Sequence, residues 1–105
     1  MNDKLLSTLG LCRKAGKLVW GFDATAQAVA GGKAKLVLLA RDLSPKSAKE
    51  IRFLCEKHKM KAVDIPVSMD EIWYRLGKRA GILAVTDQGL AHTLESAAGR
   101  TNEEE

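Results

Sequence analysis

Two stretches in the first third of the chain have the apolar spacing of helices. In residues 3–15, apolar side chains recur every three or four positions, which predicts an amphipathic helix that ends at Gly16. Residues 23–30 are rich in alanine and predict a second helix, with Asp23 as its N-cap and two glycines at its end. The apolar face of the first helix consists of Leu5, Leu6, Leu9, Cys12 and Ala15.

Short apolar runs further along the chain predict strands. Residues 35–40 form a continuous apolar run, which is typical of a strand covered on both faces. Residues 62–65 and 82–85 are two more such runs, and residues 17–20 form a short extended piece between glycines. The chain therefore contains three clear strands and one short one.

Helix-start signals stand between these strands. Ser44 with Pro45 predicts an N-cap followed by proline at the first helical position. Residues 68–71 have the pattern of a capping box, and that helix would end at Gly77. Asp87 would cap the last helix, which carries Leu90, Leu94 and Ala97.

The order of these elements predicts an α/β fold. Helices alternate with strands, which indicates helices on both faces of a small, largely parallel sheet. The length of 105 residues and the hydrophobic content of 46% fit one domain with a real core. We expect this domain over residues 1–98 and a disordered acidic tail over residues 99–105.

Composition also bears on location and redox state. No run approaches the roughly 18 apolar residues of a membrane span, so we expect no membrane association. The first residues lack the hydrophobic region of a signal peptide, so a cytoplasmic location is expected. Cys12 and Cys55 stand where helices need small apolar residues, and we expect both to be buried and reduced.

The charge of the chain is polarised along its length. Residues 1–61 carry 13 basic and 5 acidic side chains, a net charge of +8, whereas residues 62–105 carry 4 basic and 8 acidic, a net charge of −4. Such polarisation favours a polyanionic partner, although lysines also simply solvate helix surfaces.

The sequence argues against phosphate-loop, metal and catalytic chemistry. The pairs Gly16-Lys17 and Gly32-Lys33 lack the other glycine and the hydroxyl residue of a P-loop. Cys55 and His58 share a helix face, but a zinc site needs four ligands at recognisable spacing, and we expect both to pack in the core. Asp42 and Asp87 follow strands at turns, where aspartate is structurally useful. We therefore expect no enzyme activity, cofactor, metal or small-molecule substrate.

Basic residues cluster around the predicted start of the second helix. A helix N-terminus ringed by cations suits phosphate oxygens because its first backbone N–H groups are free. The fold expected above would bring the cations to one basic edge beside Gly21. These cations are Arg13, Lys14, Lys17, Lys33, Lys35, Arg41, Lys78 and Arg79.

Several blocks of the chain resemble a known family. The block Gly-Lys-Ala-Lys-Leu-Val-Leu-Leu-Ala at residues 32–40 is the most specific of them. It resembles the kink-turn-binding ribosomal protein family typified by archaeal ribosomal protein L7Ae, and the chain is most similar to its short bacterial, YlxQ-like branch. The similarity covers about residues 4–95, with further blocks at residues 9–18, 21, 54–57, 76–77 and 84–89.

This resemblance implies a three-layer α/β/α sandwich around a small four-stranded mixed sheet. It also implies binding to a sharply bent RNA with tandem sheared G·A pairs, without chemistry on that RNA. The family's motif Gly-x-Asn-Glu-x-x-Lys falls on Gly21, Asp23, Ala24 and Gln27, of which only the glycine is kept. Ala24 has no polar atom for a guanine edge, and Gln27 donates without a charge. We therefore expect backbone contacts to outweigh base reading.

Aromatic and apolar residues add further candidates. The family packs a short apolar loop against an extruded base, and the matching stretch here is residues 78–82. Ile82 would be this apolar contact or the first residue of the following strand, and we favour the strand. Trp20 or Phe22 would stack on a base, with core packing expected for at least one of them. We expect Trp73 in the core and Tyr74 on the surface.

Two functions follow as hypotheses. The first is non-catalytic binding of structured RNA, kink-turn-like or ribosomal, through the start of the second helix and the basic edge. The second is a protein-interaction adaptor of the same fold with a degenerate RNA site. The oligomeric state is left open. The RNA-binding candidates are Lys14, Lys17, Gly21, Phe22, Asp23, Ala24, Gln27, Lys33, Arg41, Arg79 and Ile82.

Overall fold

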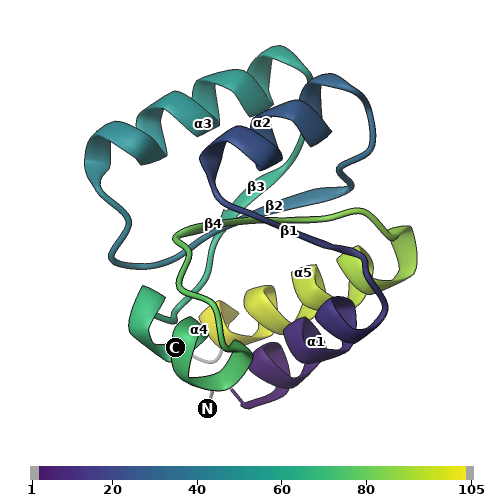
Figure 1. Ribbon diagram of the computed structural model, residues 1–105, viewed down its shortest axis with the longest axis vertical. Coiled ribbons are helices and arrows are strands. Elements are labelled where there is room, and N and C mark those ends of the chain that lie inside the picture. Colours follow the sequence, from purple (N-terminus) through teal and green to yellow (C-terminus); the bar gives the residue numbers. More distant parts are fainter. Residues whose placement is uncertain (1–2, 104–105) are drawn as a thin grey trace.

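A four-stranded sheet separates two layers of helices in the computed structural model (Figure 1). The structure describes the backbone of residues 3–103 and the side chains of residues 3–98. Helices α2 and α3 cover one face of the sheet, and α1, α4 and α5 cover the other. The elements are α1 (Asp3–Lys14), β1 (Leu18–Trp20), α2 (Phe22–Ala30), β2 (Leu36–Leu39), α3 (Pro45–Lys57), β3 (Ala62–Asp64), α4 (Met69–Leu76), β4 (Ile82–Val85) and α5 (Gln88–Glu103).

The sheet has the strand order β1-β4-β2-β3 and is mixed. Strand β4 is antiparallel to both β1 and β2, while β2 and β3 are parallel. The α/β/α sandwich with a mixed sheet is confirmed, but the largely parallel sheet expected from the element order is wrong. A parallel β4 would need a connection that carries the chain back to the opposite end of the sheet. Helix α4 has only eight residues and does not do so, because β4 starts at the sheet end where β3 finishes. Strand β4 therefore runs antiparallel to its neighbours.

Both faces of the two central strands are buried, as their apolar runs predicted. In β2, Leu36 and Leu38 face the core cluster beneath α1, α4 and α5, whereas Val37 and Leu39 face the cluster beneath α2 and α3. Strand β4 divides its side chains between the clusters in the same way. This alternation is the period of two residues that a strand imposes.

Most predicted helix boundaries are confirmed. Ser44 caps α3, and its side-chain oxygen accepts a hydrogen bond from the Ser47 amide. Ser68 and Glu71 form the predicted capping box of α4, and Gly77 ends that helix in the left-handed region. The Asp87 carboxylate accepts a hydrogen bond from the Leu90 amide at the start of α5.

The predicted N-cap of α2 is wrong. Gly21 occupies that position, and Asp23 lies on the surface within the first turn. The reason is conformational, because Gly21 has φ of 89° and ψ of 168°, a backbone region open to glycine alone. The chain therefore enters the helix two residues before the aspartate.

Two side chains assigned to the core are on the surface. Trp73 is 57% exposed because α4 packs through Ile72 and Leu76, and the next residue along points about 100° away. His58 is exposed because α3 ends before it, so the helical spacing no longer determines its direction. Tyr74 is on the surface as predicted, and Cys12 and Cys55 are buried free thiols as predicted.

The last helix is longer than predicted. Helix α5 continues to Glu103, past the domain boundary expected at residue 98, while Glu104 and Glu105 of the predicted tail lie outside the described residues. None of the helices in the described part of the chain combines the length and apolar character that crossing a membrane requires.

Candidate functional site

The strand directions divide the loops between two ends of the sheet. Strands β1, β2 and β3 run in one direction and β4 runs against them, so three strands finish where β4 begins. We call this the Gly21 end; it consists of residues 21–24, 40–43, 66–69 and 78–81. We call the opposite end the lysine end; it consists of residues 13–17, 31–35, 57–61 and 86–87. The nine residues of α2 span about 13 Å between the two ends.

Backbone hydrogen bonds hold the loops of the Gly21 end together. The Gly21 amide donates to the Ile82 carbonyl at 2.8 Å, and the Ala40 amide donates to the Gly81 carbonyl at 2.9 Å. The loop before β4 therefore lies between the start of α2 and the end of β2. A Cβ at Gly81 would come within 2.7 Å of Leu43 Cδ1 and 2.9 Å of Met69 Sδ, so a larger residue there would force these two side chains to move.

The start of α2 presents unpaired backbone donors. Within the described part of the chain, the amides of Phe22, Asp23 and Ala24 have no hydrogen-bond acceptor, and no side chain caps this helix. Asp23 and Ala24 are exposed, whereas Phe22 is half-buried against the core beneath α2 and α3. Free amides and the positive end of the helix dipole together favour an anion at this place.

One buried polar atom lies just behind these amides. Thr25 is fully buried, and its Oγ1 has no hydrogen-bond partner among the described residues. An unpaired buried hydroxyl costs about 1–3 kcal/mol of stability. Burial of this unpaired hydroxyl in the first turn of α2 therefore lowers the stability of the fold, and no hydrogen bond among the described residues offsets that loss.

The loops of the Gly21 end carry three cationic side chains, of which Lys78 contacts Trp20 just before α2, while Arg41 and Arg79 contact α4. Lys78 Nζ lies 5.6 Å from the centroid of the Trp20 ring, an attractive cation–π distance. Arg79 Nε lies 3.0 Å from Asp70 Oδ1, so this guanidinium is already paired within the protein. Arg41 Nη2 lies 3.6 Å from Glu71 Oε1, with more than half of its side chain exposed.

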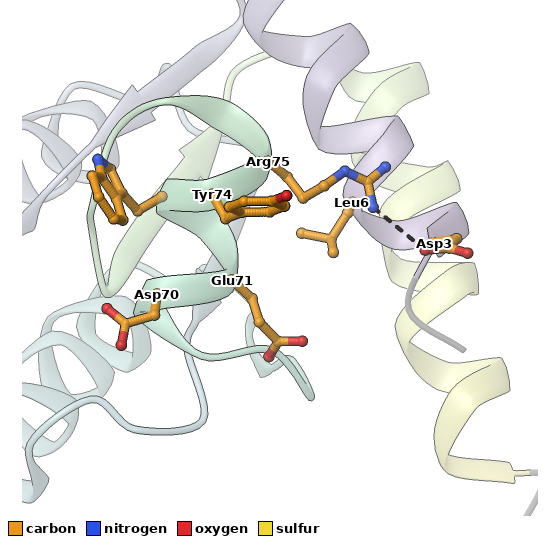
Figure 2. Close-up of a pocket in the computed structure, with 7 residues that line it drawn as sticks. Asp3, Leu6, Asp70, Glu71, Tyr74 and Arg75 are labelled. Atoms are coloured by element: carbon orange, nitrogen blue, oxygen red, sulfur yellow. Dashed lines mark hydrogen bonds and ion pairs between the residues drawn. The ribbon is translucent and has the colours of Figure 1, made fainter.

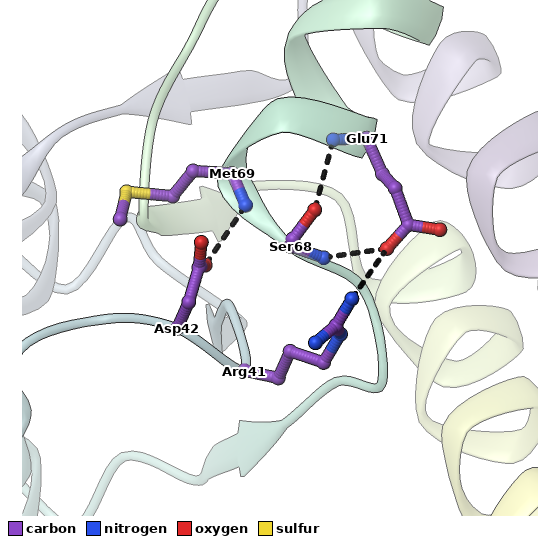
Figure 3. Close-up of polar contacts among 5 residues, drawn as sticks. All are labelled: Arg41, Asp42, Ser68, Met69 and Glu71. Atoms are coloured by element: carbon purple, nitrogen blue, oxygen red, sulfur yellow. Dashed lines mark hydrogen bonds and ion pairs between the residues drawn. The ribbon is translucent and has the colours of Figure 1, made fainter.

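Arg41 and Asp42, in the loop after β2, connect this end to α4, as Figure 3 shows. Asp42 Oδ1 accepts a hydrogen bond from the Met69 amide at 2.9 Å, beside the capping box of Ser68 and Glu71. Arg41 contacts the same Glu71 carboxylate. Asp42 therefore has the structural role that its turn position predicted, and α4 is fixed against the candidate site.

The structure brings some of the predicted RNA-binding residues together and separates others. At the Gly21 end lie Gly21, Phe22, Asp23, Ala24, Arg41 and Arg79, and Gln27 is exposed one helical turn along α2. Lys14, Lys17 and Lys33 lie at the lysine end, because β1 and α2 carry the chain away from them. The single basic edge expected from the sequence is therefore wrong.

Ile82 is a strand residue, as the sequence favoured. It is 3% exposed and packs beneath α2 and α3, so its side chain is not available to an extruded base. Its backbone carbonyl matters instead, since it accepts the hydrogen bond from Gly21. The apolar-contact alternative for Ile82 is wrong.

A cleft between α1 and α4 was missed by sequence reasoning (Figure 2). It measures about 740 Å³, and the exposed rings of Trp73 and Tyr74 line it. Arg75 pairs with Asp3 across it at 3.4 Å. Two consecutive aromatics on one short helix could have indicated it, because both cannot face the same core.

The residues with possible catalytic chemistry are dispersed. Asp42 lies at the Gly21 end and Asp87 at the lysine end, and each accepts a hydrogen bond from a helix-start amide. Among the described residues, no three His, Cys, Asp or Glu side chains are grouped so that they could hold a metal ion. Burial, with the nearby Asp87 carboxylate, raises the pKa of Cys12 to about 11, which disfavours a reactive thiolate.

Comparisons with known proteins agree with this fold. Residues 3–95 match the model of the ribosomal protein L7Ae/L30e/S12e/Gadd45 family. The chain is 37% identical over 93 residues to the RNA-binding protein YlxQ of Bacillus subtilis, covering 84% of this chain and 88% of that protein. It is 31% identical over 95 residues to the large ribosomal subunit protein eL30B of Schizosaccharomyces pombe, covering 84% and 77%. A solved Bacillus halodurans structure of a protein with unknown function superposes with a TM-score of 0.86 at 25% identity, covering 91% of this chain and 97% of that one.

Proposed function

The chain belongs to the ribosomal protein L7Ae/L30e/S12e/Gadd45 family, and we propose that it binds structured RNA through the Gly21 end. The RNA is kink-turn-like or ribosomal, and the protein performs no chemistry on it. Relatives of the chain are named as an RNA-binding protein and a large-subunit ribosomal protein. The proposed place of action is the cytoplasm.

One observation carries the proposal: three unpaired amides begin α2 next to the loop that carries Lys78 and Arg79. The amides of Phe22, Asp23 and Ala24 would donate to phosphate or sugar oxygens, with Lys78 and Arg79 at the flank. The hydrogen bond between Gly21 and Ile82 keeps the helix start and the flanking loop in a fixed relation. A prearranged surface loses less conformational entropy on binding than a mobile one.

The side chains on this surface would read bases weakly. Asp23 is exposed at the position where the family motif has asparagine, and its charge would repel nearby phosphates. Ala24 offers no acceptor to a guanine edge, and Gln27 offers an uncharged donor. We therefore propose that backbone shape and charge determine affinity, and that discrimination between base sequences is modest.

The test is a titration of the protein against a kink-turn RNA and an unbent duplex of equal length, at several salt concentrations. The proposal predicts tighter binding to the bent RNA at every salt concentration. Equal affinity for both RNAs would remove the preference for a bend. No binding at low salt would remove RNA binding itself.

The cleft between α1 and α4 supports a second candidate, a protein-interaction adaptor. Exposed aromatic rings such as Trp73 and Tyr74 are enriched at protein interfaces. This candidate predicts an association that survives ribonuclease treatment and is weakened by Tyr74→Ser. The RNA proposal predicts that Tyr74→Ser leaves affinity for the bent RNA unchanged.

A further inference from the structure

Each of the three strands that run in the same direction is preceded by a lysine. Lys17, Lys35 and Lys61 stand immediately before β1, β2 and β3. Their backbones are fixed by the sheet: the Lys17 and Lys61 carbonyls accept from Thr86 and Val37, and the Lys35 amide donates to Val85. With neighbouring strands about 4.8 Å apart, the row from β1 to β3 spans about 14 Å.

Further cations accompany each lysine of this row. Lys14, Lys33 and Lys59 lie two or three residues earlier in the same three loops, and all of these side chains are exposed. No ion pair to a described residue forms at Lys14, Lys17, Lys33, Lys35 or Lys59, whereas Lys61 pairs with Glu95. The complete set of cations is Arg13, Lys14, Lys17, Lys33, Lys35, Lys57, Lys59 and Lys61.

The two ends of the sheet thus differ in electrostatic state. At the Gly21 end, Arg41 and Arg79 are balanced by Glu71 and Asp70, and of the three cations there only Lys78 lacks an ion pair to a described residue. At the lysine end, the Asp87 carboxylate caps α5, and most of the lysines have no counter-charge within the described chain. Unpaired like charges repel one another in the free protein, and a polyanion would relieve that repulsion.

A simpler account is that these lysines neutralise helix C-termini, since α1, α2 and α3 all end at this side of the sheet. It suits Lys14 and Lys57, which lie in the last turns of α1 and α3. It does not explain Lys17 and Lys35, which directly precede strands, and Lys61 pairs with Glu95 instead. The helix dipole falls off within a turn, so Lys17 and Lys35 need a different explanation.

We propose that the lysine end is a second RNA-binding surface that contacts the sugar-phosphate backbone of a duplex without reading its sequence. This inference rests on the proposed function and extends it, because the protein would hold two segments of one RNA at opposite ends of its sheet. Among the side chains of the loops at residues 13–17, 31–35 and 57–61, His58 is the one aromatic ring on which an unpaired base could stack, whereas eight are cationic. Charge therefore dominates recognition at this end, which suits duplex phosphates.

The test uses two RNAs and matched double variants of the full chain. One RNA is a kink-turn with short stems, and the other has the same kink-turn with one stem lengthened by a helical turn. The lysine-end variant is Lys33→Gln with Lys35→Gln. The control removes the same charge from the outer face of α3, as Lys46→Gln with Lys49→Gln, where both lysines are also exposed. Circular dichroism melting checks that each variant folds.

The wild type is expected to bind the lengthened RNA more tightly and with a steeper dependence on salt. The lysine-end variant should lose this gain, and its log–log salt slope on the lengthened RNA should flatten by about 1.4–1.8, the loss of two phosphate contacts. The control should keep most of the gain. Binding of the lysine-end variant to the short RNA should remain close to wild type.

The outcomes separate this inference from the proposed function. If the lysine-end variant matches the control, or if the wild type gains nothing from the longer stem, the second surface does not exist, although binding of the bend stands. If the wild type binds neither RNA, the proposed function fails and the second surface fails with it. Loss of the length-dependent gain in the lysine-end variant alone supports the inference.

Discussion

The backbone amide of Gly21 donates a 2.8 Å hydrogen bond to the carbonyl of Ile82 and so fixes the start of α2 against the start of β4. These residues are far apart in sequence, and neither side chain is needed for the contact. The bond places unpaired helix amides beside the loop that carries Lys78 and Arg79. The proposed RNA surface therefore depends on backbone geometry more than on particular side chains.

Replacing Gly21 tests that backbone geometry. Gly21→Ala should lower the free energy of unfolding by about 1–3 kcal/mol, because φ of 89° strains any residue with a Cβ. The space around it is open, so a clash would not be the cause. Gly10→Ala in α1 is the control; its Cβ would lie an ordinary 3.8 Å from Leu76, and it should stabilise by about 0.5–1 kcal/mol. Urea denaturation measures both, and equal effects would contradict the assigned strain.

Restoring the family's side chains tests base reading. Asp23→Asn with Ala24→Glu should raise affinity for a kink-turn RNA by about tenfold or more, taking about 1–3 kcal/mol for each base that the new side chains hydrogen-bond. Both positions are exposed at the start of α2, so folding should tolerate the change. Filter binding against the bent RNA and the unbent duplex measures the effect. No gain on the bent RNA would mean that the motif has been placed on the wrong residues.

The buried hydroxyl of Thr25 gives a prediction about stability. Thr25→Val replaces an unpaired polar group with a methyl group of similar size, so it should stabilise by about 1 kcal/mol. That gain corresponds to a rise in Tm of about 4–8 °C for a small domain. Thr8→Val is the matched control, because Thr8 Oγ1 donates to the Lys4 carbonyl at 2.8 Å. It should bring no increase, and a lower Tm for Thr25→Val would show that its hydroxyl has a partner.

The buried thiol of Cys12 predicts how stability depends on pH. Its pKa rises from 9.0 to about 11 in the folded chain, so the unfolded chain releases the proton first as pH increases. The contribution of the protonated Cys12 thiol to the free energy of unfolding is complete below pH 9 and is lost as pH rises towards 11. Wild type should be more stable than Cys12→Ala, which leaves a cavity at a fully buried position, and at pH 10 this difference in the free energy of unfolding should be about 1.4 kcal/mol smaller than at pH 7. A constant difference in denaturation experiments would contradict the raised pKa.

Much of the fold could be predicted because local signals agreed with the tertiary structure. The runs that became β2 and β4 were recognisable as strands buried on both faces, and Ser44, Ser68 and Asp87 cap helices as predicted. The direction of β4 could not be predicted, because it depends on the end of the sheet at which the chain leaves the short helix α4.

The candidate site was only partly predictable, because its residues are brought together by tertiary structure and not by local sequence. The sequence placed the start of the second helix beside Gly21 but named Asp23 as its N-cap, because the positive φ of Gly21 is a property of the folded backbone. The sequence alone did not place Lys17 and Arg41 at opposite ends of the sheet, because the directions of the strands decide this: Lys17 precedes β1, and Arg41 follows β2, which runs in the same direction. Trp73 was misassigned because aromatic character alone does not show which face of α4 is buried.

The most direct measurement is a backbone amide NMR titration of the full chain with a short-stemmed kink-turn RNA. Phe22, Asp23 and Ala24 should show the largest changes in chemical shift, because their free amides would acquire hydrogen-bond acceptors. The amides of the loop at residues 78–81 should show the next largest changes in chemical shift. Unchanged amides at the start of α2 in an RNA-saturated sample would contradict the account, whatever the measured affinity.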